Sequence, residues 1–397
     1  MVGYCSMFIA MSPVANKRIA SIDVLRGIVM VIMALDHTRD YFSNFPYNPT
    51  DLEHTNAAMF FTRWVTHYCA PIFIFLSGTS AYLSLSKGKT KKQASVFLLQ
   101  RGLWLLLLEL TIVRFGWLFN LAVTDMVGQV IWAIGWSMVC LAGLIHLPRW
   151  AILSFSLLLI FGHNALDGIK AETFGDNALY WRVLHEFGYT KLGDGIGFMV
   201  IYPLVPWVGV MATGYVLGVI MQQEEKMRNR MLYTLGITAI VLFIALRYTN
   251  LYGDASQWQP QRTGWFTVLS FINCSKYPPS LLYLLMTIGP ALVALPLLER
   301  INNTATRFFT VFGRVPMFYY ILHIYLIHTM ALVIALFMSI PANYFTGDNV
   351  FGAKPGWGFD LPMVYVFWLL TIALLYLPCR WFMFVKMNHK KWWLSYI

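Results

Sequence analysis

The chain has 397 residues, of which 58% are hydrophobic and 12% charged, and its mean hydropathy is +0.60. This composition excludes an ordinary soluble domain and a disordered chain, because its apolar runs are too long for a soluble core. The formal net charge is +11. In a membrane protein the positions of the Lys and Arg residues indicate the topology, so this charge gives no sign of a nucleic-acid partner. We therefore expect an all-α polytopic membrane protein whose surroundings are the lipid bilayer.

Ten apolar stretches approach or exceed the length of about 20 residues that a helix needs to cross a bilayer. The fifth stretch is the shortest. In chain order the predicted spans are 20–42, 57–86, 94–113, 128–147, 150–164, 198–222, 231–248, 278–298, 314–338 and 361–379.

Basic residues gather on one side of the predicted membrane when the chain is threaded through it, whereas acidic residues gather in the long loops on the other side. Short cytoplasmic loops collect Lys and Arg, so this asymmetry places both termini in the cytoplasm. The predicted organisation is an N-terminal tail over 1–19, one transmembrane domain over 20–379, and a basic and aromatic tail over 380–397.

The first predicted span carries charged residues near both of its ends, which is costly inside a membrane. Arg26 and His37 are eleven positions apart, which makes three helical turns plus about 20°, so both side chains lie on one face about 16 Å apart. Met30 and Met33 lie between them. We expect an apolar strip with a permanent cation at one end and a titratable imidazole at the other.

The second predicted span adds Arg63 and His67, which share a face at a depth comparable to that of His37. Pro71 follows one turn later, where it frees a backbone carbonyl and is expected to kink the helix. The small residues of the segment SGTS, 77–80, favour close helix approach. In the third span, Arg101 lies in the half predicted to be cytoplasmic.

The ninth predicted span places Arg314 at its cytoplasmic end, with His323 near mid-depth on the same face as Tyr319. A single intramembrane histidine is more often a packing residue than a catalyst, but several ionisable groups together indicate a polar interior or pathway. His37 is the best candidate for a general base, because its ordinary pKa is near neutrality. The carboxylate that orients it is Asp36, Asp40 or an acid from another helix.

Three segments resemble the bacterial relatives of heparan-α-glucosaminide N-acetyltransferase, and the resemblance extends over nearly the whole chain. They are RIASIDVLRGIVMVIMALDHTRDYF, FFTRWVTHYCAPIFIFLSGTSAYL and GRVPMFYYILHIYLIH. The spacing of Arg26 and His37 also resembles the signature of the broader transmembrane acyltransferase superfamily. The resemblance implies cytoplasmic acetyl-CoA as donor and a carbohydrate, often an amino sugar, as acceptor at the outer face of a bacterial inner (plasma) membrane.

The sequence departs from the family pattern at the proposed base. The lysosomal enzyme has an asparagine where His37 falls, and its essential histidine lies slightly later, before the second span. His54 is the nearest counterpart by order along the chain. The base therefore remains open among three histidines, with His37 first and His67 and His54 behind it.

The sequence hypothesis is a CoA-dependent transfer of an acetyl or other acyl group to a hydroxyl or amine. Arg26, Arg101 and Arg314 would hold the CoA phosphates, and His67 or His323 would donate a hydrogen bond to the thioester oxyanion. No metal is predicted, because two histidines without a third ligand are weak support for one. The runner-up is a transporter that uses the same polar groups as a solute or proton pathway, and a structural protein ranks last. The sequence leaves open the acceptor and the oligomeric state, a homo-oligomer included.

Overall fold

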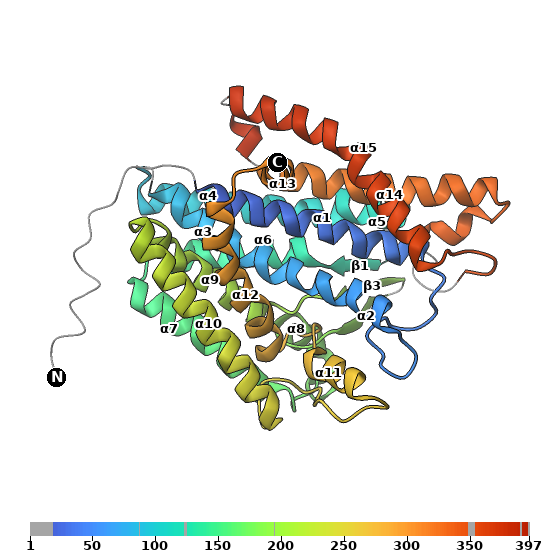
Figure 1. Cartoon of the computed structure of the whole chain (residues 1–397), viewed down its shortest axis with the longest axis horizontal. Helices are drawn as coiled ribbons and strands as arrows, with labels where there is room; N and C mark the ends of the chain where they lie inside the picture. Colours follow the sequence, from blue (N-terminus) through green and yellow to red (C-terminus); the bar gives the residue numbers. More distant parts are fainter. Residues whose placement is uncertain are drawn as a thin grey trace.

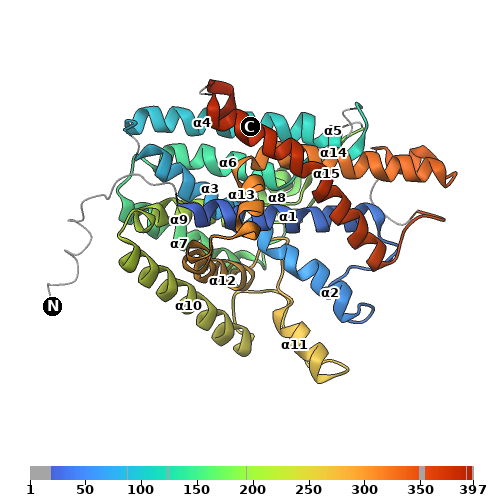
Figure 2. The same ribbon diagram turned by 45° about the horizontal axis from the view of Figure 1, so that its top comes forward.

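The computed structural model describes residues 19–86, 88–122, 125–193, 195–347, 354–389 and 391–395. Almost all of the predicted N-terminal tail, 1–19, lies outside these residues, as do 390, 396 and 397 of the predicted C-terminal tail. Helix α1 (Ala20–Phe42) runs along the middle of the helical assembly in both views (Figures 1 and 2). The Ala20 end and the Phe42 end of this helix mark the two ends of the bundle.

Helices make up most of the described chain, with one small sheet. The α-helices after α1 are α2 (Ala57–Trp64), α3 (Cys69–Leu85), α4 (Lys91–Leu108), α5 (Arg114–Leu118), α6 (Val130–Leu144), α7 (Arg149–Gly162), α8 (Ala178–Leu184), α9 (Leu204–Met221), α10 (Glu225–Thr249), α11 (Gly264–Ile272), α12 (Leu281–Arg300), α13 (Thr304–Arg314), α14 (Pro316–Phe337) and α15 (Leu361–Asn388). Short helical turns are η2 (Val65–Tyr68), η3 (Glu109–Val113), η4 (His163–Leu166), η5 (Ala171–Asn177), η6 (Ala342–Phe345) and η8 (Trp392–Ser395).

Eight helical segments of the described chain are long and apolar enough to cross a membrane. This confirms the predicted class of helical membrane protein. The other two predicted spans are also helical: α1 carries several charged residues, and α6 has 15 residues. Helix α15 continues beyond the predicted end of its span at 379 and includes the first residues of the predicted C-terminal tail.

The small sheet is a feature that the sequence prediction missed. Strands β1 (Asp125–Gly128), β2 (Gly188–Gly193) and β3 (Ile196–Val200) pair in the order β1-β3-β2, with β1 parallel and β2 antiparallel to β3. The predicted sixth span began at 198, which is wrong, because β3 occupies that position and α9 begins only at Leu204. The sheet lies at the Phe42 end of the bundle (Figure 1).

The ninth predicted span also needs correction. It was expected to start at 314 as one helix, but α13 ends at Arg314 and α14 begins at Pro316. Proline has no amide hydrogen to donate and fits the first turn of a helix, where no intrahelical partner is required. Arg314 therefore lies at the C-terminal end of α13 and outside the membrane-crossing helix.

The second span contains the irregularity that its proline predicted. The 3₁₀ turn η2 separates α2 from α3, and Pro71 lies in the first turn of α3. Pro71 cannot donate to the carbonyl of His67, and the hydroxyl of Tyr283 on α12 donates to that oxygen instead, at 2.7 Å. The freed carbonyl is thereby satisfied inside the bundle.

Helix α1 is buried along almost its whole length, and it packs against α3, α12, α13, α14 and α15. Its closest neighbour is α13, where glycines face each other. A Cβ on Gly27 would lie 1.8 Å from the carbonyl oxygen of Phe309, and a Cβ on Gly313 would lie 1.8 Å from that of Asp23. Gly78 of the predicted SGTS segment meets α9 in the same way, 2.0 Å from the Met211 oxygen, which confirms the close approach predicted there.

We expect Gly27→Val to lower the stability of the protein by about 1–3 kcal/mol or more, because the new side chain must push α13 away from α1. The measurement is the thermal unfolding of the purified protein in detergent. Gly143→Ala is the control: Gly143 lies in α6 with open space around it, so alanine should leave stability unchanged or raise it slightly. Equal melting temperatures for Gly27→Val and the unsubstituted protein would contradict the packing described here.

Candidate functional site

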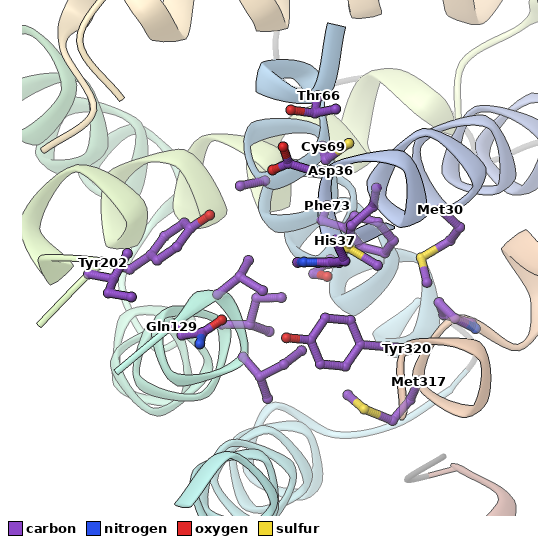
Figure 3. Close-up of a pocket in the computed structure, with 18 of the residues that line it drawn as sticks. Met30, Asp36, His37, Thr66, Cys69, Phe73, Gln129, Tyr202, Met317 and Tyr320 are labelled. Atoms are coloured by element: carbon purple, nitrogen blue, oxygen red, sulfur yellow. The ribbon is translucent and has the colours of Figure 1, made fainter. Parts of the chain in front are cut away.

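A cavity of about 230 Å³ lies inside the bundle beside α1. Its wall is formed by residues from α1, α2, η2, α3, α4, α5, α6 and α14 and from the loops before α6, α9 and α12. His37 points into the middle of it, and the hydroxyls of Tyr202 and Tyr320 face the same space (Figure 3). This volume is below the roughly 300–1,000 Å³ of a pocket for a drug-sized ligand, so the cavity suits the reacting end of a larger molecule.

The wall of the cavity is apolar toward the Ala20 end. Met30 and Met33 both line it, which confirms the apolar strip predicted on α1 between Arg26 and His37. Met138 of α6 and Met317 of α14 line it as well, and Arg101 of α4 adds a cation to this wall. Methionine side chains are flexible and polarizable, so they suit a narrow passage for a long, thin ligand.

The polar end of the cavity is organised by the carboxylate of Asp36, which is buried. One oxygen lies 2.6 Å from a guanidinium nitrogen of Arg39, one turn along α1, and the other accepts a hydrogen bond from Arg63 of α2. Arg39 also reaches Asp40, at 2.5 Å. Two carboxylates and two guanidinium groups thus form one connected cluster, and pairing of this kind is what makes buried charges tolerable.

His37 lies next to this cluster but is not held by it. Its Nδ1 is buried and has no hydrogen-bond partner among the described residues. Its ring contacts Trp117 edge-on, with centroids 4.7 Å apart, and lies 5.1 Å from the ring of His323. Asp36 was predicted to orient His37, but both of its carboxylate oxygens are engaged by arginines. The imidazole is instead held by packing against the neighbouring rings.

The other three candidate histidines occupy different surroundings. His323 is fully buried, and its Nδ1 hydrogen-bonds to the carbonyl oxygen of Tyr319 at 3.0 Å. The His67 ring packs edge-on against the ring of Tyr283, and His67 is not part of the cavity wall. His54 lies away from the cavity in the loop after α1, with 43% of its side chain exposed.

His54 forms a local hydrogen bond with Asp51 at 2.8 Å and stacks on the ring of Tyr47. The hydrogen bond from His54 lowers the pKa of Asp51 below its ordinary value. Each of these contacts stays within the loop that links α1 to α2. The structure therefore brings His37 and His323 together and leaves His54 outside.

The three candidate donor-binding arginines are also divided. Arg101 lies on the cavity wall. Arg26 and Arg314 converge on the carboxylate of Asp23, at 3.7 Å and 3.6 Å, and Arg26 also donates to Ser80 at 2.7 Å. Both therefore lie at the Ala20 end of α1, off the cavity wall.

Several lining residues were missed by sequence reasoning. Gln129 follows β1, and its backbone amide donates to Glu109 at 3.0 Å, which fixes the start of α6 beside the cavity. Tyr320 lies one residue after Tyr319, which had been singled out only for its spacing to His323. Lys276 and Tyr277 come from the loop before α12. The only sequence signal for Lys276 was a lysine in a predicted outer loop, and other outer loops contain lysines too.

The loop that carries Lys276 is held from behind by a second buried charge pair. Asp254 accepts hydrogen bonds from the Ser275 amide at 2.9 Å and from the hydroxyls of Ser275 and Ser280 at 2.6 and 2.8 Å. Arg247 lies 3.8 Å from Asp254 and donates to the backbone carbonyls of Ser256, Ser270, Phe271 and Asn273. These bonds fix the backbone on either side of Lys276.

The fold and this site define a polytopic membrane protein with a buried cavity that extends along one helix, from the cation Arg101 to a histidine whose Nδ1 has no hydrogen-bond partner in the described part of the chain. Residues 18–249 match the family described as heparan-alpha-glucosaminide N-acetyltransferase, catalytic, and this match covers more than half of the chain. The chain belongs to this family of membrane acetyltransferases, which use acetyl-CoA. A comparison with curated proteins gave no match. Among the described residues, no group of three or more His, Cys, Asp or Glu side chains is arranged to hold a metal ion.

We expect Asp36→Asn to lower stability by about 3–5 kcal/mol, because it leaves Arg63 without its counter-ion and removes one of the two carboxylates that Arg39 contacts. Thermal unfolding of the purified protein is the measurement. Asp51→Asn, which removes a carboxylate from an exposed loop, should change the melting temperature little. An Asp36→Asn protein that melts with the unsubstituted one would show that the cluster does not depend on this carboxylate.

Proposed function

We propose that this protein transfers an acetyl group from cytoplasmic acetyl-CoA to a hydroxyl or amine of a carbohydrate acceptor on the opposite side of the membrane. The observation that carries the proposal is the single cavity whose wall includes both Arg101 and His37. The donor would enter from the Ala20 end and the acceptor from the Phe42 end. The membrane would be the plasma membrane of a bacterium.

The distribution of charge and loops supports this orientation. Exposed basic residues cluster where helices turn at the Ala20 end. They are Lys89 before α4, Lys91 and Lys92 in the first turn of α4, and Lys226 and Arg230 in α10. The long connections, with the sheet and with α8 and α11, lie at the Phe42 end (Figure 1). Short loops rich in Lys and Arg stay in the cytoplasm, so the Ala20 end would face the donor pool.

Arg101 is the first choice for a donor-binding residue, because among the three candidate arginines it is the one that lies on the cavity wall. Guanidinium groups bind phosphate oxygens through paired, charge-assisted hydrogen bonds. Arg26 and Arg314 would stand behind it at the mouth of the cavity. The pantetheine arm would pass the methionines, while the nucleotide stays outside, since the cavity volume is too small for it.

His37 would act as the general base. It removes the proton of the acceptor hydroxyl or amine, whose oxygen or nitrogen then bonds to the acetyl carbon while the carbon–sulfur bond of the thioester breaks. The proton passes from His37 to the departing CoA thiolate, which balances the reaction. Its Nδ1 without a hydrogen-bond partner supports this role, because a base needs a nitrogen that the protein does not already occupy.

Two neighbours of His37 receive different proposed roles. A neutral His323 that gives its Nδ1 hydrogen to Tyr319 carries its lone pair on Nε2, so it accepts a hydrogen bond and is a poor donor to an oxyanion. We therefore assign His323 to support of the protonated His37 ring. Tyr320, whose hydroxyl faces the cavity beside His37 (Figure 3), is the better donor to the developing negative charge on the thioester oxygen. His67 and His54 stay behind His37 as candidate bases.

His37→Ala should lower acetyl transfer by roughly 10²–10⁴-fold, the usual contribution of a general base. Acetyl-CoA binding should persist, because the donor's phosphates are held elsewhere. The measurement is mass spectrometry of a sugar panel incubated with isotopically labelled acetyl-CoA and purified protein in liposomes. His146→Ala is the matched control, because it removes an exposed histidine off the cavity wall and should keep its transfer activity. Full activity of His37→Ala on every accepted sugar would contradict this mechanism. Uptake of an unmodified solute in place of acetylation would contradict it as well.

Arg101→Ala should weaken acetyl-CoA binding by roughly 10- to 100-fold, the range for a lost hydrogen bond to a charged group. Isothermal titration calorimetry on the detergent-purified protein measures this dissociation constant. Arg149→Ala removes an exposed guanidinium that lies over the ring of Tyr82, off the cavity wall, and should bind acetyl-CoA as the unsubstituted protein does. Unchanged affinity in Arg101→Ala would move the donor site away from the cavity.

A further inference from the structure

The charges at the polar end of the cavity do not cancel. Asp36 and Asp40 are matched by Arg39 and Arg63, with which they form one connected cluster. Behind the adjoining loop, Arg247 and Asp254 match each other. Among the described residues, Lys276 is the remaining cation on this part of the wall.

Lys276 is 9% exposed, and its side chain lines the cavity. Among the residues that the structure describes, its ammonium group has no hydrogen bond or ion pair, and it lies over the ring of Tyr277, with 5.2 Å between the nitrogen and the ring centroid. An ammonium group removed from water without a counter-ion is costly. The protein nevertheless fixes this residue in place through the Asp254 hydrogen bonds to Ser275 and Ser280.

The surroundings of Lys276 favour negative charge. Burial and Asp36 would raise the pKa of the neighbouring Tyr277 hydroxyl, but Lys276, Arg63 and a hydrogen bond with Tyr202 lower it below its ordinary value. The two cations therefore contribute a positive potential at this point of the wall. Any anion that enters the cavity at this point meets the same potential.

We propose that Lys276 is the anchor of a subsite for one acidic group, a carboxylate or a phosphate ester, on the acceptor that reacts at His37. The acidic group supplies the counter-ion that the cavity lacks, and it fixes the acceptor on the wall that Lys276 shares with His37. That the bound molecule is an acceptor depends on the acetyl transfer proposed for this protein. The subsite itself rests on the charge count and on the burial of Lys276. A neutral sugar would leave the ammonium unpaired and would bind more weakly.

The test is isothermal titration of the full-length purified protein with glucose, glucuronic acid and glucose 6-phosphate at constant ionic strength. These probes differ at one carbon, which is neutral, carboxylated or phosphorylated. We expect at least one acid to bind roughly 10- to 100-fold more tightly than glucose. A preference for glucuronic acid points to an acidic sugar, and a preference for glucose 6-phosphate points to a sugar phosphate. Acids that bind no more tightly than glucose would overturn the subsite.

Three variants separate the charge of Lys276 from other effects. Lys276→Gln should abolish the preference for the acid, whereas Lys276→Arg should keep most of it. Lys191→Gln is the matched control, because it removes an exposed lysine on β2, off the cavity wall, and should keep the preference. A preference that survives in Lys276→Gln would refute the assignment.

Thermal unfolding gives a second readout that does not depend on any ligand. Removal of a buried ammonium without a counter-ion should raise the melting temperature of Lys276→Gln above that of the unsubstituted protein. A lower melting temperature would mean that Lys276 has a structural role, and it would contradict the proposal. Labelled acetyl-CoA assays run in parallel keep the two proposals distinct: an acid preference without any acetyl transfer leaves the subsite standing and removes the transfer scheme.

Discussion

The carboxylate of Asp36 is held between two guanidinium groups, one from its own helix and one from α2. Charged groups inside a membrane protein must find partners there, because lipid offers none. This requirement ties α1 to α2 at the polar end of the cavity, as the tight packing of Gly27 and Gly313 ties α1 to α13 at the other end. Between these two fixed points, α1 presents Met30, Met33 and His37 to one internal space.

The cavity places groups of different chemical character along one wall. An arginine and several methionines precede a histidine that has a free ring nitrogen, and a charge cluster follows. Under the proposed function, this order would match the parts of a thioester donor and the needs of the acceptor. The loop pinned by Asp254 adds Lys276, so the polar end is not electrically neutral. Specificity for the acceptor would then depend on a residue outside the long helices.

Much of the fold followed from local pattern. The long apolar runs predicted helices at the right places, and the Pro71 irregularity appears as the turn η2. The failures have physical causes as well. The strand β3 is a short apolar segment adjoining a span, and hydropathy alone cannot separate it from the helix that follows. The sequence prediction missed the break between α13 and α14, because Pro316 lies inside one long apolar run. Proline nevertheless fits the start of a new helix.

The sequence by itself determined the face of α1 that carries Met30, Met33 and His37, because helix periodicity depends only on spacing. It also determined the class of helical membrane protein, because the length and the hydropathy of each apolar segment can be read directly from the sequence. Only the tertiary structure decided which partners these residues meet. Asp36 pairs with Arg63, His323 lies beside His37, and Lys276 enters the cavity from a loop more than 200 residues later in the chain. Such contacts join segments far apart along the chain, and packing, not local periodicity, brings them together.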